Sequence, residues 1–187
     1  MSTRNKEHLS LKSSMVVGHL PVGYMTSKFL FRMFEARQVS YRWFMFWGLF
    51  GSIAPDADMS YHYLFDYEKT HHHLYFTHFL LFWLLLLLLS IALLLLDKKR
   101  HRYPVFPFIF TLGGFFHLVL DTLAGGMTLW KAPFSRDQFF LKFIVPWGET
   151  NHVLLSYGLE AIVIVLAVLV WYRGRKKDKA PVKPDPV

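Results

Sequence analysis

The sequence has no cysteine among its 187 residues. This absence excludes disulfide bonds and thiolate metal ligands, so any metal ion must be held by histidine, aspartate or glutamate. Acidic residues are also scarce: the chain has 13 Asp and Glu against 21 Lys and Arg, which gives a net charge of +8. No internal repeat is evident. No cleavable signal peptide is expected, since the first apolar stretch contains His19, Pro21 and Lys28.

Apolar residues are abundant, at 53% of the chain, and aromatic residues make up 18%. Residues 75–96, 105–124 and 153–172 form three runs that are long enough to cross about 30 Å of hydrocarbon as helices. Residues 15–34 and 39–54 form two weaker stretches, one with polar insertions and one short and aromatic. The pattern predicts an all-α, polytopic membrane bundle of about five helices, with three clear spans and two short or polar N-terminal helices.

This pattern divides the chain into three parts. Residues 1–14 form a polar N-terminal segment, and residues 15–172 form the membrane-embedded domain. Residues 173–187 are rich in Lys and Pro, which predicts a disordered tail.

Basic residues gather in short clusters at the ends of the apolar runs, notably at 98–102 and 173–179. This placement is typical of cytoplasmic loops and argues against a nucleic-acid partner, which would need a basic face. The C-terminus is therefore expected in the cytoplasm, and the loop 125–152 outside. This orientation places the N-terminal segment outside. That segment contains the basic residues Arg4, Lys6 and Lys12, which the charge rule would favour in the cytoplasm.

With this orientation, histidine and aspartate residues gather toward the outer ends of several helices. They are His19, Asp56, Asp58, His73, His78, His117 and Asp121. Imidazole and carboxylate ligands without thiolate suit Zn first, with Mn or Fe as alternatives. The set exceeds the needs of one tetrahedral ion, so either one or two divalent ions are expected.

Each member of this set also has a purely structural interpretation. His117 and Asp121 are spaced i, i+4 on one helix face, where a hydrogen-bonded pair could simply join helices. Asp56 and Asp58 follow Pro55, a combination common in turns. The residues alone therefore leave a metal-ion or proton transporter and a structural membrane protein open beside an enzyme.

Five short motifs follow one another over residues 15–135. They are Gly18-His19, Pro55-Asp56-Ala57-Asp58, His73 with Thr77-His78, His117-Leu118-Val119-Leu120-Asp121, and Trp130 with Pro133-Phe134. In this order they resemble the YdjM-like membrane-bound, metal-dependent hydrolases, a family distantly similar to zinc-dependent phospholipase C. The resemblance implies an inner-membrane protein that holds its metal with the seven residues above. With the apolar runs and the basic clusters, an integral, multi-pass protein is expected, with this site toward the periplasmic face.

A hydrolase of this kind would also give the residues distinct roles and partners. Asp58 and His73, or His71 or His72 in its place, would ligate a second ion or act as general acid and base. The family usually has Arg-Gly where this sequence has Leu74-Tyr75, which bears on the substrate more than on the metal. Lys131 and Arg136 are the cations expected to neutralise a phosphoester or phospholipid-like substrate. Membrane lipid is the expected partner, and no oligomeric state is predicted.

Overall fold

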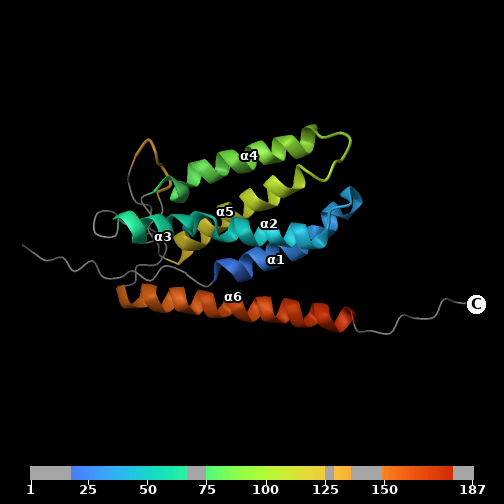
Figure 1. The fold of residues 1–187 in the computed structure, drawn as a ribbon. Helices are drawn as coiled ribbons and strands as arrows, with labels where there is room; N and C mark the ends of the chain where they lie inside the picture. The colour runs from blue at the N-terminus through green and yellow to red at the C-terminus, as the bar shows by residue number, and fades with distance from the viewer. Residues whose placement is uncertain (1–17, 67–74, 125–128, 136–148, 179–187) are drawn as a thin grey trace, which may run out of the picture.

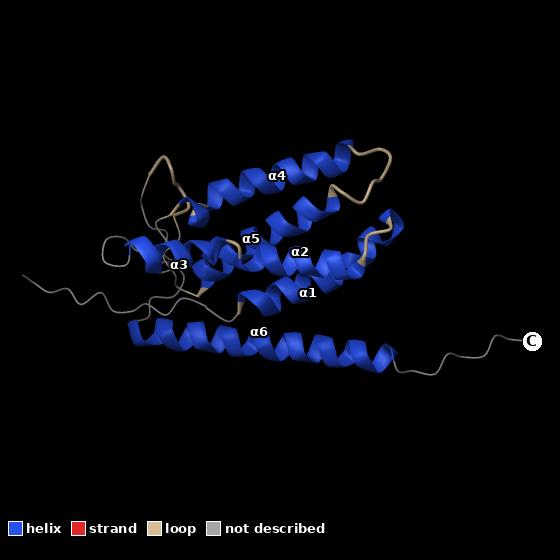
Figure 2. Ribbon diagram, viewed as in Figure 1, coloured by secondary structure: helices blue, strands red, loops and turns tan. Residues whose placement is uncertain are grey.

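The computed structural model describes residues 18–66, 75–124, 129–135 and 149–178 of the chain. Within these ranges every regular element is helical (Figure 2). The α-helices are α1 (His19–Phe31), α2 (Tyr41–Ile53), α3 (Asp58–Tyr61), α4 (Leu80–Leu96), α5 (Val105–Leu123) and α6 (Glu149–Asp178). The predicted all-α fold is confirmed, and α3 is a short addition of 4 residues to the five helices expected.

Two helices of the described part are long and apolar enough to cross a membrane: α5 and the Ser156–Arg175 portion of α6. The third run, residues 75–96, is shorter than expected, because its α-helix α4 begins only at Leu80 and has 17 residues. A 3-10 turn, η5 (Phe76–His78), occupies the start of the run, and Phe79 after it is extended. Three clear spans are therefore not confirmed.

Helices α1, α2, α4 and α5 run alongside one another, with α6 along the outside next to α1 (Figure 1). Half of the apolar window of α5 is buried, against 6% of that of α6. α5 is thus an inner helix, whereas α6 presents most of its apolar surface outward. An outer surface of this kind suits contact with lipid.

The backbones of α2 and α5 touch where glycines leave room. A Cβ added to Gly51 would lie 2.1 Å from the carbonyl oxygen of Phe110, and one added to Gly113 would lie 2.7 Å from the Ser52 nitrogen. Such small-residue contacts are typical of helix packing in membranes, where close approach maximises van der Waals attraction. This contact, the α2–α5 seam, fixes the two helices that carry most of the site described below.

Helix α4 packs on the other side of α5. The hydroxyls of Ser90 and Thr111 lie 2.9 Å apart across this interface. The ring of Trp83 covers Gly114, where a Cβ would come within 2.1 Å of it. The bundle is therefore held by close contacts and a neutral hydrogen bond as well as by apolar packing.

Basic residues gather at the end of the bundle away from the start of α1. The α1–α2 connection, the α4–α5 turn and the end of α6 all lie there (Figure 1). Arg37 donates to the carboxylate of Asp97 at 2.6 Å and to the carbonyl of His101 at 3.0 Å. Helix α6 continues beyond residue 172 to Asp178, so the predicted tail is helical at its start.

Candidate metal centre

Segments from four parts of the chain meet at the opposite end of the bundle (Figure 1). The 3-10 turn η2 (Pro55–Ala57) follows α2, and η5 leads into α4. The first residue of α1 and the last two turns of α5 lie against them. Five of the predicted ligands come together there: His19, Asp56, His78, His117 and Asp121.

His117 lies at the centre of this cluster and is 1% exposed. Its Nδ1 donates a hydrogen bond to the carbonyl oxygen of Ser52, at 2.8 Å. The α2–α5 seam brings that carbonyl into reach, since Gly113 packs directly on Ser52. With Nδ1 occupied as a donor, the neutral ring carries its lone pair on Nε2, which faces the two carboxylates.

Asp121 links two imidazoles. Its Oδ2 lies 3.3 Å from Nε2 of His117, one helical turn earlier on α5. Its Oδ1 lies 3.3 Å from Nε2 of His19, which comes from α1. The two rings stack, with centroids 3.7 Å apart and an angle of 16° between their planes. Two imidazolium cations stacked this closely would repel one another, so the arrangement disfavours protonation of both rings at once.

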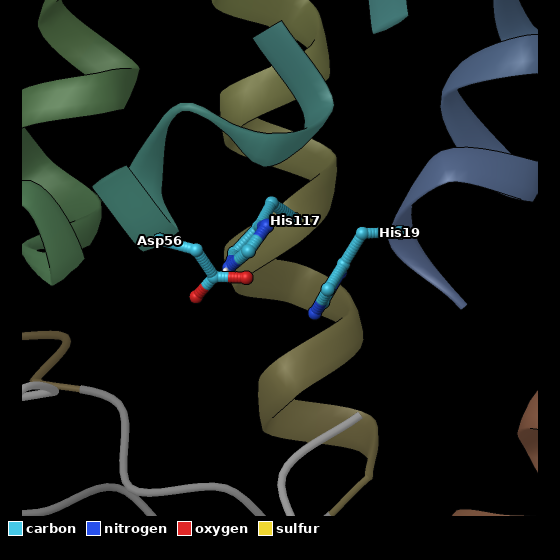
Figure 3. Close-up of side chains that lie close together, drawn as sticks. All are labelled: His19, Asp56 and His117. Carbon is cyan, nitrogen blue, oxygen red and sulfur yellow. Dashed lines mark ion pairs between the residues drawn. The ribbon is translucent and has the colours of Figure 1, made fainter. Parts of the chain in front are cut away.

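Asp56 forms the open side of the cluster. Its Oδ1 lies 3.4 Å from Nε2 of His117 and 3.6 Å from Nε2 of His78. The Asp56 side chain is 26% exposed, whereas that of Asp121 is 2% exposed. Figure 3 shows Asp56, His117 and His19 converging from three different elements. Asp56 is therefore the ligand candidate of this cluster that is most accessible to solvent in the described part of the chain.

The pKa values of the turn residues follow from this placement. Burial raises the pKa of Asp56, but interactions with His117 and His78 outweigh it, so the pKa is lower than usual. Burial lowers the pKa of His78, but Asp56 and Asp58 more than compensate, so that pKa is raised. Both shifts express the attraction between carboxylate and imidazole in a place with little water.

The distances themselves indicate what the cluster can hold. Hydrogen bonds from nitrogen to oxygen are about 2.7–3.2 Å long, whereas the four carboxylate–Nε2 pairs are 3.3–3.6 Å apart. Ligands about 2.1 Å from a zinc ion at tetrahedral angles lie about 3.4 Å from one another. The buried Nε2 of His117 and Oδ2 of Asp121 also lack hydrogen-bond partners in the described part of the chain. The donor atoms thus fit around a small divalent cation.

Two overlapping groups of three can serve as ligands. One is His19, Asp56 and His117, and the other is His78, His117 and Asp121. In each group the donor atoms lie within 4.8 Å of one another. His117 belongs to both groups, so it is the residue on which a metal site here depends most.

A comparison with protein families adds to this geometry. The family model described as YdjM inner membrane protein matches residues 15–180. The chain belongs to the YdjM inner membrane protein family. Neither a curated protein nor a solved structure matched the chain. The resemblance seen in the motifs is thereby confirmed, and YdjM membership together with the apolar helices supports a membrane location.

The remaining candidate residues of this YdjM protein belong to neither group of three or fall outside the described residues. His73 and Arg136 fall outside the described residues. Asp58 is buried but contacts His78 from the side away from Asp56, and it belongs to neither group of three. Lys131 is exposed and stands outside both groups.

The last YdjM motif lies beside the cluster. Leu129 pairs with the backbone of Phe79, the residue after His78, and is 1% exposed. Trp130 donates from Nε1 to the Thr122 hydroxyl on α5, at 3.0 Å. Trp130 of this motif thus contacts α5, and the adjacent Leu129 pairs with the residue just before α4, next to the residues that carry the candidate ligands.

Sequence reasoning missed two contributors. The Ser52 carbonyl, which orients His117, leaves no trace in the residue type, because any residue there has a carbonyl. Thr77 was visible only as part of the Thr-His motif, although its hydroxyl donates to Asp58. Its position one residue before a candidate ligand was the signal available.

Proposed function

We propose that this YdjM protein is a membrane-bound, metal-dependent hydrolase. The observation that carries the proposal is the cluster of two buried histidines, His19 and His117, around Asp121, with Asp56 on the open side. Their spacing suits a Zn, Mn or Fe ion. A bound ion of this kind would lower the pKa of a water ligand to about 7 and so supply a hydroxide nucleophile.

The protein groups have distinct parts in this proposal. The side chains of His19, His117 and Asp121 are buried, so they would hold the ion away from bulk water. Asp56, which is partly exposed, borders the side on which substrate enters. Low polarity around the buried groups strengthens their electrostatic interactions with charge that develops during hydrolysis.

The proposed substrate is a phosphoester or a phospholipid-like molecule. Lys131 is exposed on the segment that packs beside the cluster, where it can neutralise a phosphate. The apolar outer surface of the bundle, including α6, suits a substrate that is itself held in the lipid. Arg136 has the same expected role but lies outside the described residues.

The proposed orientation places the metal centre at the outer face of the inner membrane. Basic side chains gather at the other end, around Arg37 and residues 98–102 and at the end of α6. Because cytoplasmic loops are enriched in Lys and Arg, that end would face the cytoplasm, and the C-terminus with it. The helices would then cross the membrane several times.

A transporter has less support. The buried ionisable groups in the described part of the helices cluster at one end, whereas the Ser90–Thr111 pair between α4 and α5 is neutral. A path for ions or protons would need ionisable groups at successive depths.

Elemental analysis of the detergent-purified protein tests the metal centre. We expect one or two equivalents of Zn, Mn or Fe in the wild type and their loss in the double variant His117→Ala, Asp121→Ala, which removes both sides of the central pair. The double variant Ser90→Ala, Thr111→Val is a matched control, since it disrupts a buried contact of α5 away from the cluster.

The control variant should retain the metal. Absence of metal from the wild type, even after reloading, would instead favour a structural role for the His–Asp pairs. If metal is present, phosphoesters and phospholipids in micelles are the substrates to assay. Loss of hydrolysis in the double variant but not in the control would support the enzyme.

A further inference from the structure

The two aspartates of the Pro-Asp-Ala-Asp motif have different surroundings. Asp56 faces Nε2 of both His78 and His117. Asp58, the first residue of α3, is 9% exposed and contacts His78 on its other ring nitrogen. A buried carboxylate is costly unless it is paired or hydrogen-bonded. The Oδ1 of Asp58 has no hydrogen-bond partner in the described part of the chain, so the partners of its Oδ2 indicate its role.

Both partners belong to η5, where Thr77 and His78 are consecutive residues. The Oδ2 of Asp58 accepts a hydrogen bond from Nδ1 of His78, at 2.9 Å. The same oxygen accepts one from the hydroxyl of Thr77. Because a carboxylate can only accept, Nδ1 of His78 must carry the proton, and in the neutral ring the lone pair then lies on Nε2. That nitrogen points toward Asp56 and the cluster.

Thr77 is itself held by a hydrogen bond from a residue of α4. Its carbonyl oxygen accepts a hydrogen bond from Nε1 of Trp83, at 2.7 Å. Trp83 is 3% exposed and packs on Gly114 of α5. A continuous series of contacts therefore runs from α5 through Trp83 and Thr77 to the Asp58–His78 pair.

We infer that Asp58 and Thr77 are positioning residues, which set the tautomer and orientation of His78, rather than metal ligands. The inference rests on the proposed metal centre and assigns a different role from the one expected of Asp58 from the sequence. Carboxylates that hold a ligating histidine in this way commonly strengthen metal binding about 10–100-fold.

Titration with Co²⁺ followed by its visible spectrum tests the inference, because the protein has no cysteine whose thiolate bands would interfere. We expect Asp58→Asn to bind the same number of Co²⁺ ions as the wild type, about 10–100-fold more weakly. The visible bands should also shift, because an asparagine amide can donate to Nδ1 and no longer selects one tautomer of His78.

Thr77 gives an independent variant that keeps every charge. Thr77→Val should weaken Co²⁺ binding in the same direction, and Thr77→Ser, which keeps the hydroxyl, should restore both affinity and spectrum. Asp97→Asn and Thr111→Val are matched controls, since they make the same chemical changes at sites away from the cluster. Both controls should bind Co²⁺ like the wild type.

Three results would overturn the inference, and only the last of them would also overturn the proposed metal centre. Wild-type affinity and spectrum in Asp58→Asn would show that Asp58 does not position His78. Loss of one of two bound ions in that variant would make Asp58 a ligand. A wild-type protein that binds no Co²⁺ would overturn the metal centre as well.

Discussion

At the scale of single residues, glycines decide how the site is built. The α2–α5 seam needs Gly51, because a Cβ there would lie 2.1 Å from the Phe110 carbonyl oxygen and 2.8 Å from its carbonyl carbon. Backbone atoms cannot rotate away as the end of a side chain can. The seam in turn brings the Ser52 carbonyl to His117.

We predict that Gly51→Ala destabilises the protein by about 1–3 kcal/mol or more, the usual cost of forcing an extra methyl group into a packed interface. Thermal unfolding in detergent micelles measures the effect. Gly158→Ala on α6 is the matched control, because a Cβ there meets nothing within 4 Å. Gly158→Ala should be neutral or slightly stabilising. Equal losses of stability in the two variants would contradict the role proposed for Gly51 in the α2–α5 seam.

Residue types in the sequence indicated which side chains carry the candidate chemistry, but not how each one points. Asp56 lies in the 3-10 turn η2 and Asp58 is the first residue of α3, so no single helical period relates the directions of the two side chains. Their different partners follow from the fold, which places His78 between them. His117 and Asp121 were more predictable, because i, i+4 spacing on a long helix places both on one face.

At the scale of helices, apolar runs predicted position better than boundaries. Helix α2, expected over 39–54, spans Tyr41–Ile53, and α5, expected over 105–124, spans Val105–Leu123. The run 75–96 was misleading at its start, because the aromatic residues Phe76 and Phe79 join it to the leucines that follow. Only the fold shows that the chain turns there and directs His78 inward.

The Ser90–Thr111 contact gives a prediction for the α4–α5 pair. The two hydroxyls are buried and lie 2.9 Å apart. A double-mutant cycle with Ser90→Ala and Thr111→Val should give a coupling of about 0.6 kcal/mol, and at most about 1.7 kcal/mol, as for other hydrogen bonds between membrane helices. Unfolding in mixed micelles measures it. A coupling near zero would mean that packing alone joins the two helices.

At the scale of the whole molecule, charge and chemistry occupy opposite ends. The candidate ligands meet where α1 and α4 begin, and the basic residues gather around the α4–α5 turn and the end of α6 (Figure 1). The charge pattern of the sequence was sufficient to predict this separation. Which helix packs in the centre could not be read from it, because α4 is at least as apolar as α5.

Cysteine labelling tests the proposed orientation, and the absence of native cysteine leaves no background. Ser60→Cys lies on the exposed surface beyond η2, and Lys99→Cys lies in the exposed α4–α5 turn. We expect a membrane-impermeant maleimide to label intact spheroplasts at position 60 but at position 99 only after the inner face is opened. The reverse pattern would place the metal centre on the cytoplasmic side.

The α2–α5 seam has a mechanical consequence. The backbones of α2 and α5 are in direct contact, so the two helices can tilt together but cannot move closer to each other. The pair therefore behaves as one rigid body. Bilayers that thin or thicken change the tilt of helices. Such a change would move His117 and the Ser52 carbonyl as one body. Deformation would then fall on the more loosely attached α6, and the contact between His117 and the Ser52 carbonyl would stay constant from one lipid environment to another.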